Sequence, residues 1–100
     1  MGAQLNIFDS VQSNLSLLLK QKQEQLQKLN YSLGSTQKEL NTYDPNDYED
    51  RNEINACNQQ IRYCKQQIDE LNLEIADLEQ QILNNQRLSN QLKMYQQRQM

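Results

Sequence analysis

The chain has 100 residues, with 13 acidic and 10 basic side chains and a formal net charge of −3, a length that fits a single domain. Only 36% of the residues are hydrophobic, and two Gly and one Pro are present, so the residues needed for the many turns of a sandwich or barrel are missing. This composition excludes a thick layered core and favours long helices. Without His, Gly-rich loops or metal-ligand spacings, we expect a non-enzymatic chain without cofactor or metal.

A helix is predicted over residues 1–43. Eight apolar residues along it share one heptad frame: Phe8, Leu15, Leu19, Leu26, Leu29, Leu33, Leu40 and Tyr43. Gly34 is the weak point, because Gly commonly follows a helix end and Thr36 with Glu39 has the spacing of a capping box. We expect one continuous helix, since the heptad frame resumes at Leu40.

An acidic turn is predicted at residues 44–47. Pro45 disfavours helical geometry at the preceding residue, and Asn46 or Asp47 suits the cap of a following helix. The acids here and a neighbouring Tyr form a candidate tip for docking on a basic partner surface. Its residues are Asp44, Asp47, Tyr48, Glu49 and Asp50.

A second helix is predicted over residues 48–97. Nine consecutive seam positions follow a three–four spacing: Ile54, Cys57, Ile61, Cys64, Ile68, Leu71, Ile75, Leu78 and Ile82. Cys57 and Cys64 are interpreted as small core residues, because seam positions bury their thiols. Beyond Ile82 the next seam positions are polar, and Leu88, Leu92 and Tyr95 predict a restart of the heptad in a shifted frame.

Together these elements predict an all-α fold: a two-helix hairpin with an antiparallel coiled-coil stem, forming one domain. Its intrachain seam comprises Leu15, Leu19, Leu26, Leu29, Leu33, Leu40, Ile54, Ile61, Ile68, Leu71, Ile75, Leu78 and Ile82. The register that pairs these residues also places Gln12 opposite Asn85, where two amides can satisfy each other. It leaves Lys22 in the seam, with its ammonium group in reach of Glu74 or Glu79.

The alternative fold is a parallel dimerisation rod of the second helix, because Ile at a and Leu at d also suits parallel pairs. In such a rod, the residues beside the seam of one copy would pair with those of the other. These pairs would attract only weakly, and Glu74 would face Glu79 of the other copy. The hairpin is favoured for these reasons.

Apolar residues off the seam predict self-association of the hairpin into a homodimeric four-helix bundle. The candidate residues are Ile7, Val11, Leu17, Leu18, Leu83, Leu88, Leu92 and Tyr95. Nucleic acid is an unfavoured partner, because basic residues are sparse. The sequence shows no leader peptide or membrane span, so a cytoplasmic location is expected.

We therefore expect an assembly protein, such as a small scaffold, adaptor or chaperone-like subunit, that contacts itself and an unidentified protein partner. The alternative is a regulatory inhibitor or a stalk component of a larger machine such as a secretion apparatus, which would act through the acidic tip or the apolar residues.

Overall fold

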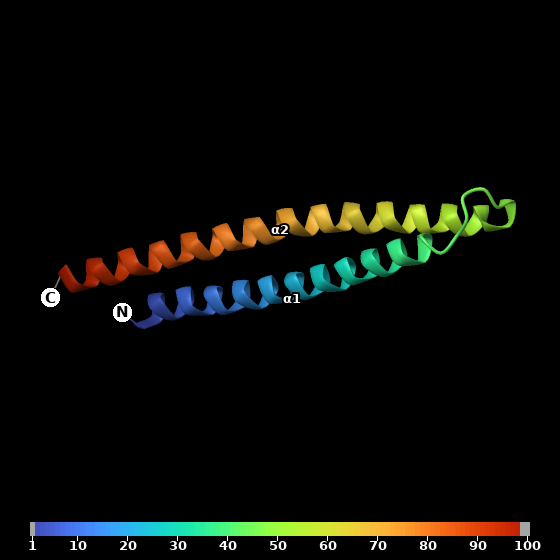
Figure 1. Cartoon of the computed structure of the whole chain (residues 1–100). Helices are drawn as coiled ribbons and strands as arrows, with labels where there is room; N and C mark the ends of the chain where they lie inside the picture. The colour runs from blue at the N-terminus through green and yellow to red at the C-terminus, as the bar shows by residue number, and fades with distance from the viewer. Residues whose placement is uncertain (1, 99–100) are drawn as a thin grey trace. The chain divides into compact units, whose positions relative to one another are not determined.

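The computed structural model describes the backbone of residues 2–98 and the side chains of residues 6–98. Two long helices form most of this chain: α1 covers Gly2–Leu40 and α2 covers Arg51–Arg98 (Figure 1). The short 3-10 helix η1, Tyr48–Asp50, precedes α2. Residues 2–98 contain no strand. The predicted all-α fold, with two helices joined by a turn, is confirmed.

Packing between the helices divides the chain into two compact units. The turn unit consists of residues 24–73, and the described part of the terminal unit joins residues 2–23 with residues 74–98. Both helices pass through both units, so each unit pairs one segment of α1 with one antiparallel segment of α2. Each unit is therefore a short two-helix coil.

Burial in both units follows the heptad spacing. All thirteen expected seam residues are buried or half-buried, while most residues between them are exposed. The deepest positions belong to α2: Cys64 is 0% exposed, Cys57 5% and Leu71 7%. Because α1 covers this side of α2 within each unit, the seam is not available for a parallel rod.

The expected shift of frame after Ile82 is wrong. Asn85 is buried and Leu92 is half-buried, so the original spacing continues and Leu92 belongs to the seam. Leu88 and Tyr95 are more than half exposed. The physical reason is that the facing segment of α1 keeps its own frame. A shift in α2 alone would break the layers that the two segments share.

Helix α1 ends at Leu40, three residues earlier than the expected end at residue 43. The Thr42 N–H donates to the Glu39 carbonyl oxygen at 3.0 Å, and the Tyr43 N–H donates to that of Leu40 at 3.2 Å. These tighter bonds between residues three apart close the helix, because Pro45 ahead disfavours further helical turns. Helix α2 begins at Arg51, after the 3-10 turn of η1.

Gly34 lies within α1, which continues through it as expected. A Cβ atom built there meets nothing within 4 Å, and no residue in this part of α1 has a positive φ. Gly in a helix interior costs roughly 0.5–1 kcal/mol relative to Ala. We therefore expect Gly34→Ala to raise the free energy of unfolding by about that amount. Thermal unfolding followed by circular dichroism should show a Tm higher by a few degrees.

Ser35→Ala, at the neighbouring exposed position, serves as the control for this change. It should stabilise the helix by less, because Ser already has a better helix propensity than Gly. A lower Tm for Gly34→Ala would contradict a continuous helix at this position.

Candidate functional site

A polar layer crosses the core of the terminal unit. Asn85 is 9% exposed on the seam side of α2. Its Nδ2 atom donates to Gln12 Oε1 at 2.9 Å and to the main-chain oxygen of Phe8 at 3.0 Å. The predicted pairing of Gln12 with Asn85 is thus confirmed. A buried amide needs its partners directly opposite, so this layer fixes the register of the two helical segments.

Lys22 occupies a seam position of α1 but keeps its charge near the surface. Its Nζ atom lies 2.9 Å from Glu74 Oε2, and the two side chains are 32% and 50% exposed. The prediction that this ammonium group reaches Glu74 or Glu79 is confirmed, and Glu74 is the partner. Because solvent screens both groups, the pair contributes at most about 1 kcal/mol.

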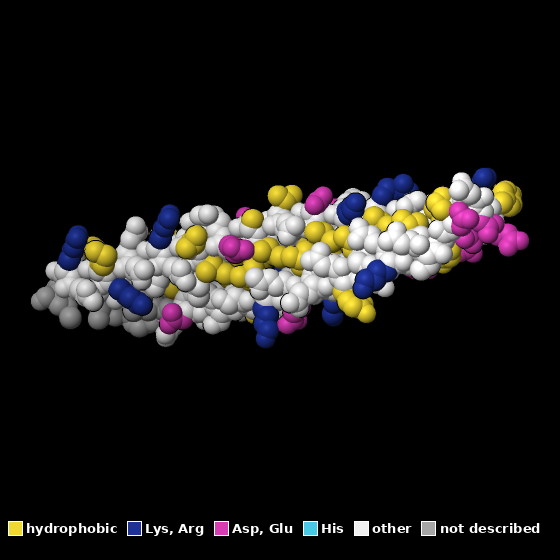
Figure 2. Space-filling model, viewed as in Figure 1, with side chains coloured by type: hydrophobic (Ala, Val, Ile, Leu, Met, Phe, Trp, Pro, Cys, Tyr) yellow, Lys and Arg dark blue, Asp and Glu magenta, His cyan; other side chains and the backbone are white. Residues whose placement is uncertain are grey.

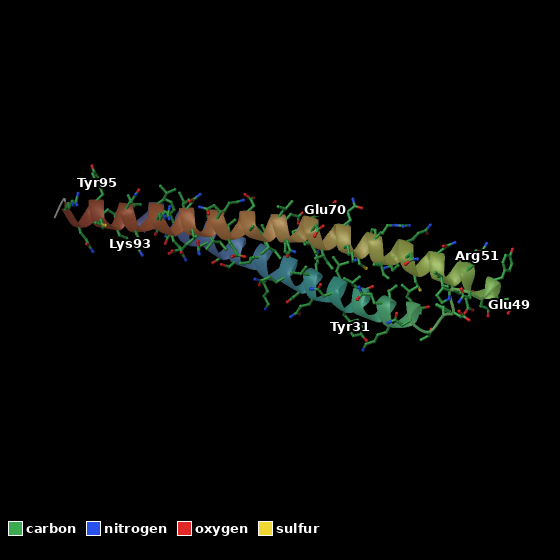
Figure 3. All side chains as sticks on the ribbon, turned by 45° about the horizontal axis from the view of Figure 1, so that its top comes forward. Tyr31, Glu49, Arg51, Glu70, Lys93 and Tyr95 are labelled. Carbon is green, nitrogen blue, oxygen red and sulfur yellow. The ribbon has the colours of Figure 1, made fainter. Side chains whose placement is uncertain are left out.

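The terminal unit has an apolar side and a polar side. One groove of about 350 Å³ is lined by Ile7, Phe8, Leu88 and Leu92. Another, of about 340 Å³, is lined mainly by polar residues: Phe8, Asp9, Gln12, Asn85, Gln86, Ser89, Asn90 and Lys93. Lys93 and Tyr95 leave α2 on different sides (Figure 3). The two grooves therefore flank the same seam and differ in chemistry.

Exposed apolar residues extend the apolar side along both helices. At 100° per residue, Ile7, Val11 and Leu18 fall within an arc of about 40° on α1. Leu88 and Tyr95 fall within about 20° on α2. All five are between 40% and 63% exposed. We call these five residues the apolar face. The groove that contains both Ile7 and Leu88 shows that the two stripes flank the same side of the seam.

The remaining predicted self-association residues lie elsewhere. Leu92 is a seam residue that lines the apolar groove. Leu17 and Leu83 are 55% and 47% exposed, but their helical positions direct them away from the apolar face. The sequence predicts which apolar residues lie off the seam. The side of the seam becomes clear only once the partner segment is in place.

The acids of the predicted tip are used to build the turn. The Asn46 N–H donates to Asp44 Oδ1, the Glu49 N–H to Asp47 Oδ1 and the Asp44 N–H to Asp50 Oδ2, each at 2.9 Å. Figure 2 shows the acidic side chains gathered at this turn. One oxygen of each of these three aspartates is thus occupied by a backbone donor. The sequence predicted a cap at Asn46 or Asp47, and the structure has it at Asp47. The other two bonds were not predicted.

Tyr48 and Arg51 form a cation–π contact beside this turn. The guanidinium carbon of Arg51 lies 5.0 Å from the centroid of the Tyr48 ring, a geometry that contributes roughly 0.5–1 kcal/mol at an exposed site. Tyr48 is 78% exposed. The docking of a basic partner at this tip remains a prediction.

The two cysteines lie in the core of the turn unit. Cys64 Sγ is 3.7 Å from Ser32 Oγ and 3.6 Å from Gln60 Nε2. Burial raises the pKa of the Cys57 thiol, and the nearby carboxylates of Glu39 and Glu53 raise it further. A thiol with a raised pKa stays protonated and unreactive near neutral pH.

Glu39 also controls the ionisation of Tyr43. The Tyr43 hydroxyl donates to Glu39 Oε1 at 3.1 Å. This hydrogen bond stabilises the protonated phenol and is the largest cause of the raised pKa of Tyr43. Both the thiol and the phenol here therefore favour their neutral forms.

Within the described residues, no group of three or more His, Cys, Asp or Glu side chains is arranged to hold a metal ion. Across that same part of the chain, no helix combines the length and apolar character that a membrane crossing requires. No family model, curated protein or solved structure matches the chain. The apolar face is the candidate functional site.

Proposed function

We propose that the chain is a non-enzymatic assembly protein that acts through helix–helix contacts and pairs with a second copy of itself. The observation that carries this proposal is the apolar face on one side of the terminal unit. Ile7 is 63% exposed and Leu88 is 53% exposed, and both line one apolar groove. Contiguous exposed apolar residues with a polar surround are typical of protein contact sites.

The polar side of the same unit supports this proposal. If the two flanks of the seam had the same chemistry, the grooves on both would be lined mainly by apolar residues. Instead, the groove on the other flank is lined by charged and amide side chains, including Asp9 and Lys93. Burial of the apolar side against another helical surface removes apolar area from water, whereas burial of the polar side would cost desolvation. A scaffold, adaptor or chaperone-like subunit would use the apolar side in this way.

Light scattering tests the proposal. The intact chain, of 11.9 kDa, is expected to show about twice the mass of one chain. The double variant Val11→Gln, Leu88→Gln should have the mass of a single chain, because it removes apolar contact area while leaving the seam intact. Circular dichroism should confirm that this variant is still helical.

Leu73→Gln is the matched control, because Leu73 is 74% exposed but lies in the turn unit. It should leave the dimer mass unchanged. A single-chain mass for the intact protein across a range of concentrations would overturn the proposal, and so would an unchanged dimer in the double variant.

A further inference from the structure

We infer that the second copy docks on the apolar face in antiparallel orientation, with a two-fold axis passing close to Val11 and Leu88. This inference rests on the proposed function and adds the orientation and register of the second copy. It would place α2 against α2 of the other copy, and α1 against α1. Leu88 would then lie close to Leu88 of the other copy, because a residue on the axis meets its own equivalent.

The charges beside the apolar face favour this orientation. Arg98 follows Leu88 by ten residues, and Asp77 precedes it by eleven. At 1.5 Å per residue these charges lie about 15 and 17 Å from Leu88, in opposite directions along α2. Asp77 and Arg98 share one heptad position, because 21 residues, or three heptads, separate them. This position lies about 50° around α2 from that of Leu88, on the same flank of the seam but farther from it.

A two-fold axis at Leu88 brings Arg98 of each copy to Asp77 of the other. The pair would form twice in the dimer, at the two margins of the contact. A parallel arrangement places residues at equal heights together, so it brings Arg98 close to neither Asp77 nor Glu74. Charge complementarity therefore selects the antiparallel arrangement of two copies.

The extent of overlap is also consistent with a stable contact. An axis at Leu88 allows α2 to overlap its copy from about residue 78 to residue 98, roughly 20 residues or 30 Å. Two helices side by side are about 20 Å wide, so each copy would bury roughly 600 Å² and the dimer roughly 1,200 Å². This area is at the lower limit of standard interfaces. The margin charges should consequently have a measurable effect on affinity.

A charge exchange tests the orientation. Asp77→Arg and Arg98→Glu should each weaken the dimer by about tenfold, because each single change replaces two attractive pairs with two repulsive ones. The double variant should restore the dissociation constant to within about threefold of the original. Sedimentation equilibrium measures the three constants, and circular dichroism checks that each variant is folded.

The matched control exchanges charges on the polar flank of the same unit. Glu79→Arg and Lys93→Glu lie on α2 with similar exposure, but on the polar side of the seam. Neither change should alter the dissociation constant by more than about twofold. If these variants weaken the dimer as much as the apolar-side variants, the inferred face is wrong.

Disulfide formation gives a second readout. Leu88→Cys should form a covalent dimer on mild oxidation, because the axis brings the two thiols together. Leu83→Cys is the control, since residue 83 is exposed but points away from the apolar face. Two results would overturn the antiparallel register while light scattering still shows a dimer. One is a double charge variant whose dissociation constant is not restored, and the other is preferential crosslinking at residue 83. Either result would leave the proposed function standing. A single-chain mass would overturn both.

Discussion

Replacing Leu71 with glutamate is expected to destabilise the turn unit by roughly 3–5 kcal/mol at neutral pH, because an ionised carboxylate would be buried without a partner. Leu71 is 7% exposed and lies on the seam side of α2. The total stability of a small domain is only about 5–15 kcal/mol. Urea unfolding followed by circular dichroism should therefore show a large loss of stability, or a chain that is largely unfolded before urea is added.

Leu73→Glu makes the same chemical change two residues away and is the matched control. Leu73 is 74% exposed, so its substitution should change the free energy of unfolding by no more than about 0.5 kcal/mol. The two variants have the same composition and net charge, so any difference between them reports burial. Equal unfolding midpoints would show that Leu71 does not lie in a buried seam.

The seam could be predicted because its spacing has one arrangement that buries every apolar position. A residue every 3.5 positions defines a single stripe on a helix, and two such stripes pack together. The register that pairs the apolar positions also explains two polar residues in the seam. Gln12 and Asn85 interrupt separate helices, and the antiparallel register puts both interruptions in one layer. The hydrogen bond between them at 2.9 Å confirms this register in the terminal unit.

The mistaken shift of frame after Ile82 has a physical explanation. Leu88 and Tyr95 are seven residues apart, so they form a stripe with the same period as the seam. A period identifies residues that share a side, but it does not determine which side is buried. That choice depends on the facing helix, where Gln12 provides the acceptor for Asn85. The misplaced stripe is part of the apolar face.

The turn itself was predicted, but most of its hydrogen bonds could not be, for a different reason. The acids of this segment suggested a charged docking tip, because an aspartate at the surface is usually solvated. In the structure, Asp44, Asp47 and Asp50 accept backbone N–H groups. Such bonds depend on local backbone geometry rather than on spacing. The N-cap at Asp47 was the exception, because its position before a helix has a recognisable pattern.

Asn85→Asp is expected to destabilise the terminal unit by roughly 3 kcal/mol at neutral pH, although the two side chains have almost the same shape. The amide donates to Gln12 Oε1 and to the Phe8 carbonyl oxygen. The substitution replaces that donor with an oxygen, so two hydrogen bonds become contacts between acceptors. Urea unfolding at several pH values measures the effect.

The pH dependence makes this prediction specific to the polar layer. Facing acceptors disfavour the charged form, so the pKa of the new carboxyl should lie above the ordinary aspartate value of about 3.9. The folded state then binds the proton more tightly than the unfolded state. The penalty is full above the raised pKa and shrinks as the pH falls through it, because the protonated acid regains one donor.

Asn84→Asp is the control for charge and position. Asn84 is exposed, and its Oδ1 accepts from Gln80 Nε2 at 3.1 Å, a role that a carboxylate also fills. This variant should change stability by about 0.5 kcal/mol or less. The native carboxylates titrate in both variants. Their contribution therefore cancels when the free energy of unfolding of one variant is subtracted from that of the other. A difference that stayed constant on acidification would contradict the donor role of Asn85, because only a carboxylate facing acceptors recovers stability by taking up a proton.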